Sequence, residues 1–244
     1  MSDVHPRVLV IACGALAREL LAITELNNFT NVTVECLPAS LHNRPKEIPE
    51  LVRTRIRRAR GQVVSGNNNQ PGSQGEGDKG LADKSLADKD LLDDGTRQAS
   101  GQFDEILIGY ADCGTGGLLE KVCAEEGVEM LAGAHCYQFF ATHDRFEQLQ
   151  DHALGSFYLT NFLARNWERL IWEGMGIAKH PELRDMYFGN YTRCVYLEQA
   201  DDPKALAAAH ECANRLGLEL HIEPTGYGEL ETAVVEFTQK VTLR

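Results

Sequence analysis

The 244-residue sequence is poor in positive charge. It has 24 lysines and arginines against 36 aspartates and glutamates, which gives a formal net charge of −12 at pH 7. An acidic surface repels phosphate backbones and anionic lipid headgroups, so we expect neither nucleic acid nor a membrane surface among the partners. The partner expected instead is a small-molecule substrate.

Long hydrophobic runs are also absent. No stretch approaches the roughly 20 apolar residues that span a bilayer. The first residues, Met1–Arg7, lack the basic region of a signal peptide, and no small-residue cleavage site follows the next apolar run. We therefore expect a cytoplasmic protein.

Aromatic residues are missing from one long segment, Val64–Gly101, which is rich in Gly, Asn, Gln, Asp and Lys. Within it Leu81-Ala82-Asp83-Lys84 is echoed by Leu86-Ala87-Asp88-Lys89. Such a composition buries too little apolar surface to offset the entropy of ordering the chain. The segment is predicted to be a flexible insertion in the fold.

Outside that segment, apolar runs alternate with helical patterns. Val8–Ala12 is a continuous apolar run, typical of a strand buried on both faces, and a helical spacing follows over 15–26. Strands that alternate with helices predict a mostly parallel sheet with helices on both faces. Further strands are expected at 32–37, 105–110, 128–132, 194–197 and 219–222, and further helices at 46–60, 117–126, 137–175, 204–216 and from 229.

The predicted fold class is therefore α/β, Rossmann-like. We expect an N-terminal half over residues 1–136, a helical connection over 137–192, and a smaller C-terminal β-α-β-α half over 193–244.

Seven cysteines are present, at positions 13, 36, 113, 123, 136, 194 and 212. An odd number without an export signal argues against a disulfide framework. Cys13, Cys113 and Cys136 each follow a predicted strand, where ligands bind in open parallel sheets. His42 and His135 follow strands as well. The other four cysteines lie inside strands or helices and are interpreted as packing residues.

Three thiols and a nearby imidazole favour a metal. We expect Cys13, Cys113 and Cys136 to be ligands, with His42 or His135 as the fourth, and zinc as the metal, since zinc prefers sulfur and nitrogen in a tetrahedral set. Helix N-termini behind Cys13 and Cys113 are expected to favour the thiolates. Two alternatives stay open: a [4Fe–4S] cluster in a redox or lyase enzyme, and a metal or corrinoid carrier or chaperone without catalysis.

Other residues at the same edge are candidates for holding a substrate. The run Gly114-Thr115-Gly116-Gly117 opens a helix and could bind an anion through backbone N–H groups. Glu19 is interpreted as part of a solvated helix face, and the aromatic run from Phe157 to Trp172 as core, with a lid as the alternative. Three further candidate binding residues are Asn43, Thr225 and Tyr227.

The chain resembles the prokaryotic family catalogued as domain of unknown function 1638. The resemblance lies in the order of Ile11–Leu16, Leu41–Pro45, Gly109–Gly114, Cys136, Gly155–Thr160 and Thr225–Tyr227. Genes of this family often stand beside corrinoid methyltransferase genes, so the resemblance implies an accessory role in one-carbon metabolism and a corrinoid protein as a partner. The family itself supplies no activity.

Overall fold

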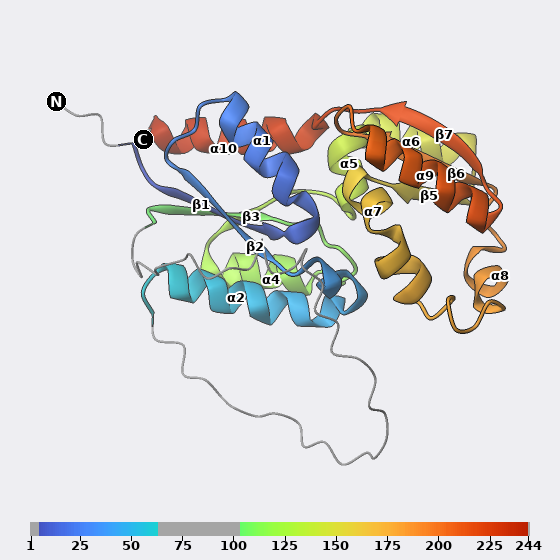
Figure 1. The fold of residues 1–244 in the computed structure, drawn as a ribbon. Helices are drawn as coiled ribbons and strands as arrows, with labels where there is room; N and C mark the ends of the chain where they lie inside the picture. Colours follow the sequence, from blue (N-terminus) through green and yellow to red (C-terminus); the bar gives the residue numbers. More distant parts are fainter. Residues whose placement is uncertain (1–4, 63–102, 244) are drawn as a thin grey trace, which may run out of the picture.

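The computed structural model describes residues 5–62 and 103–243, which form two parallel sheets with helices around them (Figure 1). The first sheet has the strand order β2-β1-β3-β4 and the second has the order β5-β6-β7. The α/β class predicted from the sequence is confirmed. The predicted insertion over 64–101 lies outside the described residues. No helix in the described part of the chain is long and apolar enough to cross a membrane.

The central strand of the first sheet is β1 (Val8–Cys13), which pairs in parallel with β2 (Val32–Leu37) and β3 (Glu105–Gly109). The short β4 (Glu129–Met130) pairs with β3. Alternate residues of β1 face opposite sides of the sheet, and all from Val8 to Ala12 are buried, because each side is covered by helices.

Helices cover both faces of this sheet (Figure 1). Val8 and Val10 pack with α1 (Ala17–Leu26) and α10 (Gly228–Thr242). Leu9 and Ile11 pack with α2 (Ile48–Ala59) and α4 (Leu118–Glu126). Because successive side chains of β1 point to opposite faces of the sheet, they pack into two separate hydrophobic cores. Three short 3-10 turns complete this half: η1 (Gly14–Leu16), η2 (Ala39–Asn43) and η3 (Pro45–Glu47).

The second sheet is centred on β6 (Arg193–Glu198), with β5 (Ser156–Leu159) and β7 (Glu219–Pro224) parallel to it on either side. One face packs against α9 (Pro203–Leu216). Asp202 caps α9, since its side chain accepts from the backbone N–H groups of Lys204 and Ala205.

The long helical region expected over 137–175 is helical only in part, because a strand interrupts it. The segment divides into α5 (Cys136–Ala141), α6 (His143–His152), β5, α7 (Asn161–Arg165) and the π-helical turn η4 (Glu168–Glu173), followed by α8 (Leu183–Phe188). Gly155 has φ of +85°, and a Cβ there would lie 2.6 Å from the carbonyl oxygen of Asn190. A helix cannot pass through this position, and the aromatic residues behind it suit a strand.

The last helix returns to the first sheet. Leu230, Val234 and Phe237 of α10 share a core with Val8 and Val10 of β1. Lys240 Nζ also lies 2.5 Å from Glu129 Oε1 beside β4. Residues from both ends of the described chain therefore build one hydrophobic core.

Candidate functional site

Three cysteines line one cavity of about 310 Å³ at the carboxyl edge of the first sheet. Cys13 ends β1, Cys113 lies in the loop after β3, and Cys136 opens α5. His42 and Asn43, from the turn after β2, line the same cavity. The edge of the sheet thus gathers side chains from four segments that are distant in sequence.

Backbone hydrogen bonds hold two of these segments side by side. The N–H of Asp112 donates to Gly133 O and that of Cys113 donates to Ala134 O, both at 3.0 Å. These bonds continue the pairing of β3 and β4 beyond the strands, and they place Cys136 next to the Cys113 loop. Cys113 itself has φ of +50°, an uncommon conformation for a residue with a side chain. The loop geometry therefore sets the direction of its thiol.

The thiols are partly buried, and burial dominates their titration. Burial raises the pKa of Cys113 to about 12, with a further increase from negative charge on Cys13. Burial also raises the pKa of Cys13 and of Cys136, and charge on Cys113 adds to the increase at Cys136. The expectation that helix N-termini would favour the thiolates is wrong, because burial raises the pKa of each thiol more than the hydrogen bonds to it lower it; at Cys13 the helix behind it is one short turn, whose N–H at Ala15 donates to Sγ at a long 3.5 Å.

The two candidate histidines lie near each other at the rim of the cavity. Both residues are exposed, and only His42 belongs to the cavity lining. Partial desolvation lowers the pKa of His42, and the proximity of His135 lowers it further. A neutral His42 has a free ring nitrogen that could serve as a metal ligand.

Sequence reasoning missed the tyrosine that lines the cavity beside the thiols. Tyr110 is 1% exposed, and its hydroxyl lies beside the Cys13 thiol but makes no well-formed hydrogen bond within the described part of the chain. Its pKa is raised by burial and then by charge on Cys13 and Cys113, so the hydroxyl lies close to both sulfurs. A buried donor without an acceptor is rare in folded proteins. A group bound between the thiols could accept from it.

No three His, Cys, Asp or Glu side chains within 5–62 and 103–243 are arranged so that they could hold a metal ion as they stand. The cavity brings the cysteines together as neighbours without placing the sulfurs around a common point. The role of these residues as ligands stays a prediction.

In the glycine-rich loop after Cys113, backbone N–H groups already donate to the carboxylate of Asp112. Asp112 accepts from the N–H groups of Gly116 and Gly117, at 3.2 and 2.7 Å, and from the hydroxyl of Thr115 at 2.8 Å. These bonds lower the pKa of Asp112, that from Gly117 most. An external anion would have to displace this carboxylate, and none of the residues Gly114–Gly117 lines the thiol cavity.

The remaining candidates lie elsewhere. Tyr227 lines a second cavity between the two sheets, and the hydroxyl of Thr225 donates to Glu198 O at 3.3 Å. Glu19 also lines the second cavity and is only 6% exposed, so its assignment to a solvated helix face is wrong. It shares the inner face of α1 with buried Leu20 and Ile23, which its spacing could have shown.

The aromatic run divides between packing and cavity wall. Trp167 is buried in the second core, whereas Phe157 and Phe162 line the thiol cavity. The cysteines interpreted as packing residues also divide. Cys123, Cys194 and Cys212 are buried in cores, and Cys36 lines the second cavity, where burial and the charge of Cys13 raise its pKa to about 12.

Fold and site together define an α/β protein with a thiol-lined cavity at the carboxyl edge of a parallel sheet. The chain belongs to the family described as a protein of unknown function (DUF1638), whose model matches residues 89–234. The matched range contains Cys113, Cys136 and the second sheet but not Cys13. No curated protein and no solved structure matches the chain.

Proposed function

We propose that this protein binds a metal ion through Cys13, Cys113 and Cys136, with His42 or His135 as the fourth ligand. The observation that carries the proposal is that three thiols and His42 line one cavity of about 310 Å³. Free cysteines are ordinarily scattered through cores as small apolar residues. Here they come from three separate segments and line the same cavity at the edge where parallel sheets bind ligands.

The neutral thiols of this cavity favour a cation as the ligand. Three thiolates placed together would repel one another, and a bound cation removes that repulsion as each thiol loses its proton. The buried hydroxyl of Tyr110 would then donate a hydrogen bond to one of the thiolates, and the hydroxyl would no longer be unsatisfied.

Ligation requires side-chain rotation, since the sulfurs do not surround a common point as they stand. Cys13 is turned toward the N–H of Ala15, and a change of its χ1 to another staggered rotamer would release it. Such a change involves a single side chain and leaves the sheet as it is.

Zinc is the preferred metal because a histidine is available to complete a tetrahedral set with thiolates. Bound zinc would supply a Lewis acid for activating a thiol or a water, which suits methyl transfer or hydrolysis. The proposal includes an accessory role in corrinoid-dependent methyl transfer and a cytoplasmic location, where free thiols persist. A [4Fe–4S] cluster on the three cysteines remains the alternative metal centre.

The test is the metal content of protein purified without oxygen. Elemental analysis should give about one zinc per chain in the parent and a marked loss in Cys113→Ser, because a hydroxyl is a poor ligand at neutral pH. Cys123→Ala is the matched control, since Cys123 is 2% exposed in the core on the α4 side of the sheet. It should keep the metal and lose only packing energy.

Either of two outcomes would remove the zinc proposal. If Cys113→Ser retains full metal, or if it and Cys123→Ala lose metal equally, the thiol cavity is not the site. A brown protein with iron and acid-labile sulfide would replace zinc by the cluster.

A further inference from the structure

Part of the lining of the thiol cavity has no role in the proposed metal site. It comes from the second half of the molecule, from β5, the start of α7, η4 and the turn that follows. Within 157–175 every residue that lines the cavity is apolar except Thr160. We call this lining the apolar wall. None of the proposed metal ligands belongs to it, so the wall is available to contact a second molecule.

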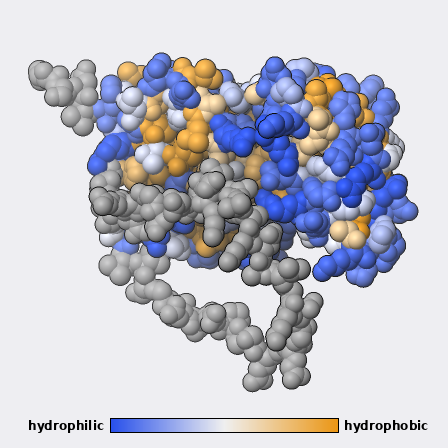
Figure 2. Space-filling model, in the orientation of Figure 1, coloured by the Kyte–Doolittle hydropathy of each residue, from blue (hydrophilic) through white to orange (hydrophobic). Residues whose placement is uncertain are grey.

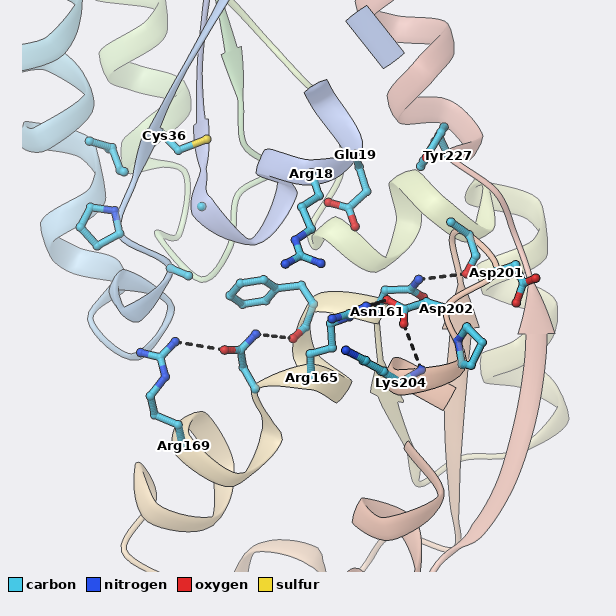
Figure 3. Close-up of a pocket in the computed structure, with 18 residues that line it drawn as sticks. Arg18, Glu19, Cys36, Asn161, Arg165, Arg169, Asp201, Asp202, Lys204 and Tyr227 are labelled. Atoms are coloured by element: carbon cyan, nitrogen blue, oxygen red, sulfur yellow. Dashed lines mark hydrogen bonds and ion pairs between the residues drawn. The ribbon is translucent and has the colours of Figure 1, made fainter. Parts of the chain in front are cut away.

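Charged residues are absent from the lining of the thiol cavity. No Asp, Glu, Lys or Arg in the described part of the chain lines it, although these residues make up 25% of the sequence. The neighbouring cavity of about 930 Å³ differs, because side chains of both signs reach into it, among them Arg18, Glu19 and Lys204 in Figure 3. Figure 2 shows hydrophilic residues gathered in this middle part of the surface. A charged molecule in the thiol cavity would lose its hydration without gaining a counter-charge, so the cavity disfavours ions other than the metal.

Two side chains of the apolar wall, Phe162 and Leu170, have no place in a core. Both are partly buried. Neither packs into any of the three hydrophobic cores that the described residues form, in contrast to Ile171, which is 5% exposed in the second core. Their apolar surface borders the cavity instead. A ligand that covers this surface removes it from water, which favours an apolar molecule as the occupant.

The cavity has few polar groups apart from its thiols. The hydroxyl of Thr160 is already used, since it accepts from the N–H of Leu163 at 3.2 Å and caps α7. His42 and Asn43 add polar side chains from the turn after β2. An apolar cavity with a few polar groups is the usual form of a small-molecule site, and about 310 Å³ lies at the lower end of the volumes of such sites. The occupant is therefore a small molecule.

We propose that the substrate of the metal site is a small uncharged molecule that is mostly apolar. Its apolar part lies against Phe162 and Leu170, and its reacting polar group lies toward the three thiols. This inference rests on the proposed function, because it takes the thiol cavity as the place of reaction. The preference for an uncharged molecule follows from the lining itself and needs no bound metal.

Isothermal titration of the full chain tests this preference with three probes that share one skeleton. At pH 7, 4-methylbenzyl alcohol is uncharged, 4-methylbenzoate is an anion and 4-methylbenzylammonium is a cation. The alcohol should bind at millimolar concentration or below, and each ion at least about tenfold more weakly, because neither ion finds a counter-charge in the cavity. Equal or tighter binding of either ion, or no binding of the alcohol at millimolar concentration, would overturn the proposal.

Two substitutions in the apolar wall test where the alcohol binds. Leu170→Glu places a carboxylate in the cavity and should weaken binding of the alcohol by about tenfold or more. Phe162→Ala removes apolar contact surface and should weaken binding severalfold, which keeps the test decisive if the charged variant does not fold. Leu21→Glu is the matched control, since Leu21 is 51% exposed on α1, outside both cavities, and this variant should bind as the parent does. Unchanged binding in both wall variants, or equal weakening in Leu170→Glu and Leu21→Glu, would overturn the site.

Repeating the titrations with zinc-loaded and zinc-free protein separates this proposal from the proposed function. The alcohol should bind in both cases, because it is held by the apolar wall. If the parent retains no metal and still prefers the alcohol to the two ions, only the metal function fails. If the parent holds zinc and shows no preference for the alcohol, only the substrate class fails.

Discussion

The hydroxyl of Tyr196, in the middle of the second sheet, donates to Oδ1 of Asn161 at 2.7 Å. Asn161 opens α7, and its own N–H donates to Gln199 Oε1 while its Nδ2 donates to Ala200 O. These bonds are buried and tie the first turn of α7 to the end of β6. Phe162, the next residue, lines both cavities, so this polar cluster positions a wall that the two cavities share.

Substitutions at different residues of this polar cluster should lower the free energy of unfolding by different amounts. Asn161→Ala removes several buried hydrogen bonds and leaves partners unsatisfied, so it should lower the free energy of unfolding by about 2–4 kcal/mol. Tyr196→Phe removes one bond and should cost about 1 kcal/mol. Urea unfolding measures both, with Tyr187→Phe on an exposed tyrosine as control. Equal losses in the two variants would contradict this ranking.

Two glycines before and at the start of α10 should differ in their tolerance of a methyl group. Gly226 and Gly228 both have positive φ, +60° and +51°, so alanine strains the backbone at either. At Gly226 no atom lies within 4 Å of an added Cβ, whereas at Gly228 it would lie 2.3 Å from Phe140 O. Gly228→Ala should therefore cost about 1–3 kcal/mol more than Gly226→Ala in thermal or urea unfolding. A smaller loss at Gly228 would show that α5 and α10 are not packed this closely.

The burial of Glu19 predicts a stability that falls as pH rises. Burial raises the pKa of its carboxyl above the ordinary value of 4.5, so the neutral form is favoured in the folded state. The folded state is penalised as pH rises from near 4.5 through this raised pKa. Glu19→Gln should thus gain about 1 kcal/mol relative to the parent at pH 8 and less at pH 5. A gain that does not depend on pH would mean that the carboxyl is not buried.

Asp112 should have the opposite dependence on pH. Its hydrogen bonds with Gly117, Thr115 and Gly116 hold its pKa below the ordinary value of 3.8, so the stability it contributes is present above that value and is lost as pH falls through the lowered pKa. Asp112→Ala should cost about 1 kcal/mol at pH 7, as for the loss of a helix cap, and less near pH 3. Asp151→Ala, at an exposed aspartate of α6, should change little at either pH. A cost that persists at low pH would contradict the assignment.

Most of the first sheet could be predicted because its strands are continuous apolar runs. Val8–Ala12 and the helical spacing behind it give β1 and α1 within a few residues of their bounds. The second sheet was harder to predict. The run Phe157-Tyr158-Leu159 is short and fits a helix as well as a strand, and only Gly155 beside Asn190 decides between them.

The two cavities also differ in how far the sequence predicts their lining residues. Cys13, Cys113 and Cys136 follow strands, and the rule that parallel strands present their carboxyl ends to ligands was enough to place them together at one cavity. Arg18 and Arg169 lie far apart in sequence and line one cavity between the sheets. No local pattern marks such a pair, since it depends on how the two halves pack.

The return of α10 to β1 also sets the order in which this protein can fold during synthesis. The ribosome releases Val8 and Val10 long before Leu230 and Val234, which belong to the same core. One face of the first sheet therefore stays incompletely covered until α10 has left the exit tunnel. The nascent chain exposes apolar surface for most of its translation, and folding chaperones would meet it there.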